Sequence, residues 1–128
     1  MIVDIGPVAA LTKLIELQLF DNQINDISPV SGLTKLTTLL LYKNQISDIS
    51  PMMGLIGVSR LYLSDNMIVD VSPLANLTNL PVLHFDDNEI DDVMPVSDLK
   101  NLEDLDCVSR NACGLFICGF GCLGISQT

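Results

Sequence analysis

The sequence predicts a repeat solenoid of the α/β type, with a curved parallel β-sheet on its concave face and short 3₁₀ or extended returns on its convex face. The first observation behind this prediction is a period of 22 residues. Equivalent segments align without gaps and begin at Leu11, Leu33, Leu55, Leu77 and Leu99, and a fixed period in this range is typical of a solenoid. The second observation is a set of leucines at fixed offsets in each copy. One copy cannot bury them alone, so the copies must stack on one another.

The strand of each copy is indicated by two apolar residues that lie two positions apart. Leu39 and Leu41 share one face of a short strand, because successive side chains of a strand point to opposite sides. Stacked strands that run in the same direction give a parallel sheet with rungs about 4.8 Å apart. The equivalent pairs in the other copies are Leu17 and Leu19, Leu61 and Leu63, and Leu83 and Phe85.

An asparagine follows the strand at the same offset in successive copies. The chain must turn inward at this point, and a buried turn leaves backbone N–H and C=O groups that need partners. A short amide side chain can pair with both kinds of group. We therefore interpret this column as structural; its members are Asn22, Asn44, Asn66 and Asn88.

Each return carries an aspartate and, three residues later, a proline. Asp side chains bond to nearby backbone amides in turns, and proline prevents a long helix from forming. This pattern predicts short 3₁₀ or extended returns. The aspartates are Asp4, Asp26, Asp48, Asp70 and Asp92, and the prolines are Pro7, Pro29, Pro51, Pro73 and Pro95.

The pattern divides the chain into three parts. Residues 1–10 align with the second half of a repeat, residues 11–106 hold the repeats, and residues 107–128 form an irregular tail. Because the chain starts within a repeat and lacks the basic region of a signal peptide, we expect a fragment, a truncated reading frame or a decayed copy. The tail is interpreted as a frame-shifted end or a divergent cap. It holds all four cysteines, whose pairing the sequence leaves open: Cys107, Cys113, Cys118 and Cys122.

No motif indicates catalysis, a cofactor or a metal. Gly119, Gly121 and Gly124 match G-x-G-x-x-G, but a dinucleotide site also needs a following helix and an acidic residue about 20 positions later. The cysteine spacings differ from the C-x₂-C pairs of zinc sites. Residues 86–92 are rich in carboxylates but lack the spacing of an EF-hand loop. His84, the only histidine, has no nucleophile at a readable spacing, so we predict a protein that is not an enzyme.

The chain is acidic, with 16 Asp and Glu against 6 Lys and Arg and a net charge of −10. Binding to nucleic acid or to an anionic membrane surface is therefore disfavoured, because both need basic groups. A partner with a basic surface is favoured during encounter. The apolar run at residues 112–125 is too short and too rich in glycine for a transmembrane helix, so no membrane insertion is expected.

The repeated pattern L-T-x-L-x-x-L-x-L-x-x-N-x-I-x-D-I-S-P-L-x-x-L resembles the 22-residue class of leucine-rich repeats. In particular it resembles the repeat domain of bacterial internalin-like surface proteins. NQISDISP at residues 44–51 and LANLTNL at residues 74–80 carry this resemblance, which covers roughly residues 2–106.

The resemblance implies a module that binds a protein, such as a host or surface receptor, through its concave sheet. It also implies a place at the cell surface or outside the cell if the chain is part of a longer protein. Two alternatives to an internalin-like surface protein remain. The first is a cytoplasmic regulatory or scaffolding protein of the phosphatase-regulator type, which has similar repeats. The second is a truncated remnant without function.

The residues that alternate with the buried strand positions are the candidates for binding. They point away from the core and do not build the solenoid, so their identity is free to serve a partner. Aromatic groups exposed together on a rigid sheet are good anchors for a protein. The candidates are Glu16, Gln18, Phe20, Thr38, Leu40, Tyr42, Arg60, Tyr62, Ser64, His84 and Asp86, and the same columns continue to Val82, Asp104 and Asp106.

Overall fold

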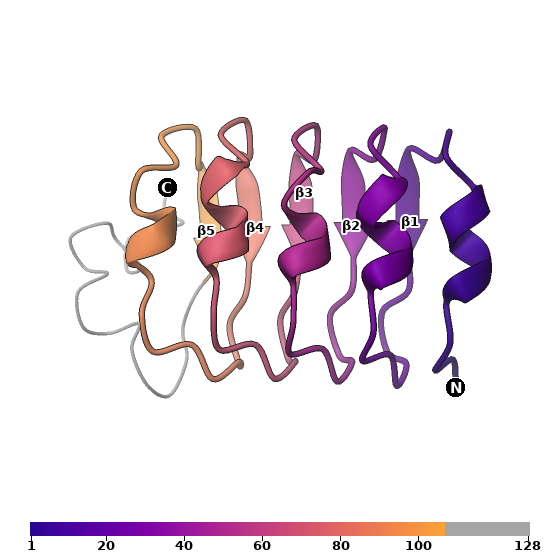
Figure 1. Ribbon diagram of the computed structural model, residues 1–128. Coiled ribbons are helices and arrows are strands. Elements are labelled where there is room, and N and C mark those ends of the chain that lie inside the picture. Colours follow the sequence, from indigo (N-terminus) through magenta and orange to yellow (C-terminus); the bar gives the residue numbers. More distant parts are fainter. Residues whose placement is uncertain (107–128) are drawn as a thin grey trace.

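Two parallel layers, one of strands and one of short helices, make up the structure (Figure 1). It is a computed structural model that describes residues 1–106. Within this range the strands are β1 (Glu16–Gln18), β2 (Thr38–Leu40), β3 (Arg60–Tyr62), β4 (Val82–His84) and β5 (Asp104–Asp106). The 3₁₀ helices are η1 (Gly6–Ala10), η2 (Ser28–Gly32), η3 (Ser50–Met52), η4 (Ser72–Asn76) and η5 (Met94–Val96).

The strands form one parallel sheet in the order β1-β2-β3-β4-β5. Each residue pairs with the residue 22 positions later, as Leu17 does with Leu39 and Leu39 with Leu61. The hydrogen bonds between rungs continue past the strand ends, where Leu19 N–H donates to Leu40 O at 2.9 Å. The predicted fold class, a parallel sheet with short 3₁₀ returns, is therefore confirmed.

The core lies between the two layers and consists of the repeated leucines, isoleucines and valines. In the second copy, Leu33, Leu36, Leu39 and Leu41 are all fully buried. Burying one such side chain stabilises the fold by about 1.5–3 kcal/mol. Leu11, the first-copy equivalent of Leu33, is 50% exposed, so stacking against both neighbouring rungs is what closes the core.

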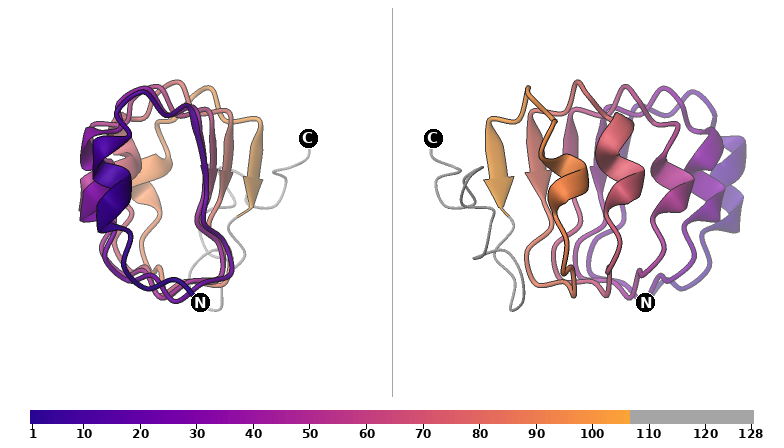
Figure 2. Two further views of the ribbon diagram at one scale, coloured as in Figure 1. Left: turned by 90° about the vertical axis from the view of Figure 1, so that its right-hand side faces the viewer. Right: turned by 60° about the vertical axis from the view of Figure 1, so that its left-hand side comes forward.

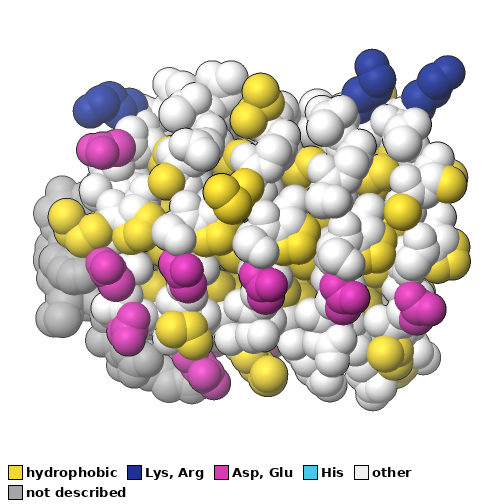
Figure 3. Space-filling model, viewed as in Figure 1, with side chains coloured by type: hydrophobic (Ala, Val, Ile, Leu, Met, Phe, Trp, Pro, Cys, Tyr) yellow, Lys and Arg dark blue, Asp and Glu magenta, His cyan; other side chains and the backbone are white. Residues whose placement is uncertain are grey.

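Each return begins with a proline in its first turn. Proline fits there since its missing N–H has no helical partner to lose, whereas further along it would break the helix. The preceding aspartate supports the same turn: Asp26 Oδ1 accepts a hydrogen bond from Ser28 N–H at 2.9 Å. Figure 3 shows the resulting row of acidic side chains across the helical side of the molecule.

The sheet lies on the concave side of the solenoid. In Figure 1 the row of helices is longer than the row of strands, so the molecule curves towards the sheet. The left view of Figure 2, which looks along the row of rungs, shows the strands on one side of the coil and the helices on the other. The predictions for residues 107–128, including the cysteines and the glycine motif, lie outside the described residues.

Candidate binding face

The concave face is the set of side chains that the strands direct away from the core. The register of the sheet aligns them in columns, since Glu16 pairs with Thr38, and Thr38 with Arg60. The first column is Glu16, Thr38, Arg60, Val82 and Asp104, and the second is Gln18, Leu40, Tyr62, His84 and Asp106. A third, just beyond the strands, is Phe20, Tyr42, Ser64 and Asp86. Most of these side chains are exposed or half-buried, so the face is open to a partner.

Four rings run across this face in a continuous aromatic row, made up of Phe20, Tyr42, Tyr62 and His84. Phe20 and Tyr42 stack with ring centroids 4.6 Å apart and planes 2° from parallel. This spacing is close to the distance between strands, because rings in the same column lie one rung apart. Tyr42 and Tyr62 are 6.4 Å apart and tilted by 57°, and Tyr62 and His84 are 4.5 Å apart and tilted by 55°.

An open hollow of about 220 Å³ lies beside the aromatic row, over β1, β2 and β3. Leu40, Tyr42 and Tyr62 supply apolar lining, while Arg60 and Glu16 add opposite charges. A hollow with apolar walls and a few polar groups is suited to hold a partner's side chain. The lining residues are Glu16, Gln18, Thr38, Leu40, Tyr42, Arg60 and Tyr62, all of them among the candidates from the sequence.

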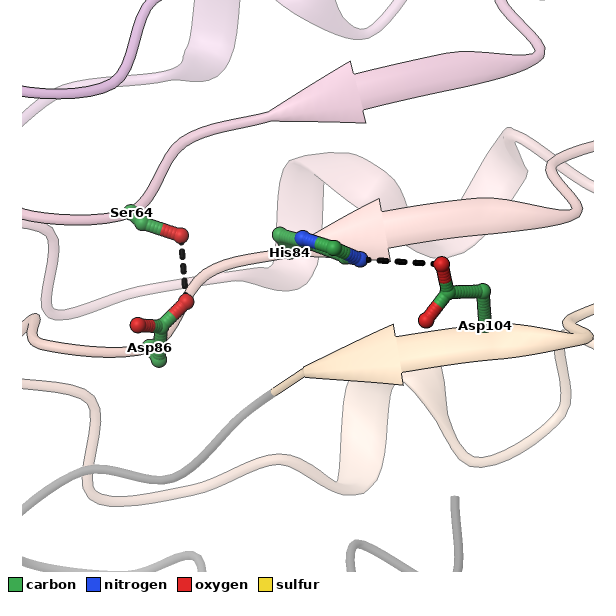
Figure 4. A network of polar contacts seen from close by, with 4 residues as sticks. All are labelled: Ser64, His84, Asp86 and Asp104. Atoms are coloured by element: carbon green, nitrogen blue, oxygen red, sulfur yellow. Dashed lines mark hydrogen bonds and ion pairs between the residues drawn. The ribbon is translucent and has the colours of Figure 1, made fainter. Parts of the chain in front are cut away.

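Carboxylates occupy the other end of the face, over β4 and β5 (Figure 4). We call Asp86, Asp104 and Asp106 the acidic end. Ser64 Oγ donates a hydrogen bond to Asp86 Oδ1. His84 Nε2 lies 3.2 Å from Asp104 Oδ2, with these side chains 22% and 47% exposed.

The pKa of Asp86 is raised above its ordinary value of 3.8, chiefly by burial, which disfavours the charged form. The hydrogen bond from Ser64 lowers this pKa, while the neighbouring Asp106 carboxylate raises it. The acidic end therefore holds a negative charge that its surroundings only partly compensate.

The asparagine side chains lie beneath the face and tie the turns of successive rungs together. Asn66 Oδ1 accepts a hydrogen bond from Ile46 N–H at 3.0 Å, and its Nδ2 donates to Leu41 O and Leu63 O, both at 3.0 Å. Asn44 and Asn88 bond in the same way. These bonds fix the third column, because that column lies on the same turns.

One feature of these turns is not predicted by the repeat pattern. The residue before each asparagine adopts a positive φ: 61° at Asp21, Lys43 and Asp65, and 55° at Asp87. This left-handed conformation is unfavourable for most side chains, but Asp and Asn tolerate it. Aspartate at three of the four positions is the sequence feature that could have indicated a positive φ. Lysine at the fourth position, Lys43, interrupts this pattern.

Within residues 1–106, no group of three or more His, Cys, Asp or Glu side chains is placed to hold a metal ion. Over the same range, no helix is long and apolar enough to cross a membrane. What the face offers is a row of rings, a hollow and fixed carboxylates on a rigid sheet.

Comparison with known proteins shows the family of the repeats and of the fold. The protein family described as leucine rich repeats (two copies) matches residues 3–52 of this chain. A comparison with the curated proteins found no match. Three similar solved structures are internalin C2 and the internalin InlF, both from Listeria monocytogenes, and a leucine-rich repeat protein from Leptospira interrogans.

Internalin C2 is 42% identical with a TM-score of 0.81, and the match covers 83% of this chain and 47% of that one. InlF is also 42% identical with a TM-score of 0.82, covering 86% and 32%. The Leptospira protein is 30% identical with a TM-score of 0.73, covering 81% and 27%. This chain therefore spans less than half the length of each.

Leucine-rich repeats are typically scaffolds for protein interaction and not enzymes. The period, the parallel sheet with 3₁₀ returns and the structural matches together identify the chain. It is a leucine-rich repeat protein of the 22-residue class, and its repeats resemble those of the bacterial internalins.

Proposed function

We propose that this chain binds a partner protein through its concave face. The observation that carries the proposal is the aromatic row beside the hollow. Phe20 remains 38% exposed although it stacks on Tyr42, and rings held in place on a rigid sheet lose little freedom when a partner covers them. Aromatic side chains are also the ones that contribute most binding energy at protein interfaces.

The hollow indicates which residues of the face would lie at the centre of the interface. Tyr42 and Tyr62 belong both to the aromatic row and to the wall of the hollow. A partner side chain that enters the hollow therefore contacts both rings, which makes Tyr42 and Tyr62 the expected centre of the interface.

Affinity capture with matched variants tests the proposal. The wild-type chain, the double variant Tyr42→Ala/Tyr62→Ala and the control Met94→Ala are immobilised and exposed to detergent-solubilised surface proteins of host cells. Met94 is 60% exposed and lies on η5, on the opposite side of the molecule. Removal of two central aromatic side chains is expected to weaken capture more than tenfold, with little change for Met94→Ala.

Circular dichroism and thermal melting of the three proteins separate binding from folding. The proposal requires the double variant to melt as a folded protein while capture is lost. Capture that survives the double substitution, or that falls only in proportion to folding, would show that the partner binds elsewhere.

We further propose that the chain works at the cell surface or outside the cell, as the resemblance to internalins suggests. An antibody raised against residues 33–54 and applied to fractionated source cells tests this proposal. A signal in the surface or medium fraction is expected, whereas a signal confined to the cytosol would contradict it.

A further inference from the structure

We propose that the partner presents an extended basic segment to the concave face, with an apolar side chain in the hollow and a Lys or Arg side chain at the acidic end. This inference rests on the proposed function and specifies the chemistry of its partner. It follows from the unequal distribution of charge along the face.

The charge changes from one end of the face to the other. Over β1 to β3 the face carries Glu16 and Arg60, whose charges cancel. Over β4 and β5 it carries the three carboxylates of the acidic end. Among residues 1–106, Asp104 contacts the His84 imidazole at 3.2 Å, and no Lys or Arg of this range forms a salt bridge with the three carboxylates.

The surroundings of Asp86 make a cation favourable at this end. The carboxylate is partly withdrawn from water and lies near Asp106, and both conditions disfavour its charge. A cationic group from a partner would offset both, because opposite charges attract more strongly where water is partly excluded. Ser64 holds Asp86 Oδ1 in place through its hydrogen bond, so this acceptor is preorganised.

The distance between the two subsites limits the partner segment. The hollow is bounded by β1 to β3, and the acidic end begins one strand further on. Two to three strand spacings separate their centres, which is about 10–14 Å. An extended chain covers this distance in about three to four residues. The partner segment is therefore expected to place its basic residue three to four positions from its apolar residue.

Selection of peptides on the folded chain provides the test. A displayed random library of peptides about twelve residues long, enough to cross the face when extended, is panned against the wild-type chain. The affinities of the recovered peptides are then measured by fluorescence titration at low and at physiological salt. We expect an aromatic or aliphatic residue with Lys or Arg three to four positions away, and binding that weakens as salt screens the charges.

Matched charge variants locate the basic contact. In Asp86→Asn/Asp106→Asn the amide at position 86 keeps an oxygen for Ser64, so the double variant is expected to fold. It should bind the peptides about tenfold more weakly. The control is Asp26→Asn/Asp48→Asn on the helical side, which removes the same charge and keeps an oxygen for Ser28 N–H and Ser50 N–H. Binding to this control should change less than twofold, within the effect of distant exposed charges.

The outcomes distinguish the inference from the function on which it rests. Peptides that need Tyr42 and Tyr62 but are neutral or acidic, or that tolerate the loss of Asp86 and Asp106, would overturn the inference and leave the proposed function standing. Peptides that ignore both tyrosines, or the recovery of no binder, would count against both.

Discussion

Buried asparagine amides hold the turns of neighbouring rungs together, one residue serving two repeats. Each inner amide accepts one backbone N–H from the preceding rung and donates to carbonyls of both rungs, as Asn66 does with Ile46, Leu41 and Leu63. Because these groups are buried away from water, losing the amide would leave them without partners.

We therefore expect Asn66→Ala to lower the free energy of unfolding by about 3 kcal/mol, the cost of leaving several buried polar groups unpaired. Asn22→Ala should cost about 1 kcal/mol, because Asn22 is half-buried and its partner Ile2 N–H lies at the exposed end of the molecule. Urea denaturation of both variants measures the difference. Equal losses would contradict the structural role assigned to the inner asparagines.

Lys43 is the residue least suited to its backbone conformation. Its φ is 61°, in the left-handed region that Asp occupies at the equivalent positions. We expect Lys43→Asn to raise the free energy of unfolding by about 0.5 kcal/mol, since Asn tolerates this conformation better. Lys35→Asn makes the same charge change outside the positive-φ positions, so it should not stabilise the protein. A similar gain in both would assign the effect to charge.

At the scale of the element, each return is a 3₁₀ helix entered through an aspartate. Asp26, Asp48 and Asp70 each accept a hydrogen bond from the backbone N–H two residues later, at 2.9 Å. This hydrogen bond, with a second from the serine side chain, holds the pKa of each carboxyl below its ordinary value of 3.8. The charged form is therefore the one that supports the helix.

A loss of stability in acid follows from these pKa values. The folded chain binds fewer protons at the three sites than the unfolded chain, so protonation favours unfolding. Their contribution is complete above the unfolded pKa and is lost as the pH falls through the lower pKa values of the folded protein. Melting temperatures between pH 6 and pH 2 measure this effect, which should be weaker in Asp26→Asn/Asp48→Asn/Asp70→Asn. An unchanged pH profile in that variant would contradict it.

The elements were largely predictable because the repeat imposes them. A gapless period of 22 residues allowed the strand register to be read from the sequence, and the structure pairs Leu39 with Leu61 in that register. The columns of the concave face follow from the same register. The positive φ values were not predicted, because the turn conformation depends on the path of the chain between two packed layers and Lys43 interrupts the one compositional signal.

The relative orientation of side chains on the concave face could also not be predicted from the sequence. Strand spacing predicts that Phe20 and Tyr42 are neighbours, but their parallel stacking depends on rotamers set by local packing. The contact of His84 with Asp104 has the same origin. The binding role of these residues stays a prediction, because the residues that build a solenoid do not encode its partner.

At the scale of the whole molecule, stability comes from contacts between adjacent rungs. Leu61 on β3 packs between two neighbouring strands, whereas β1 pairs on one side only within the described residues. In a stacked repeat each unit is stabilised by its neighbours. We expect the amides of β3 to exchange hydrogen more slowly than those of β1, as measured by NMR or mass spectrometry. Uniform exchange would indicate an all-or-none opening of the molecule.

The net charge of the whole molecule has the same sign as the acidic end of its concave face. A net charge of −10 favours encounter with a basic partner at low salt, and we propose that the acidic end is where such a partner then contacts the sheet. The long-range attraction of a basic partner and its direct contact with the acidic end can be measured separately. Removing a charge from the helical side changes only the long-range attraction.

Site-specific photocrosslinking can decide whether the concave face is the binding surface. A photoreactive benzoylphenylalanine is placed at position 42 in one protein and at position 94 in another, and each is irradiated with the proteins captured by the wild-type chain. Position 42 lies on the aromatic row and position 94 on η5. We predict covalent adducts from position 42 and none from position 94. Adducts from position 94 alone, or equally from both, would contradict it.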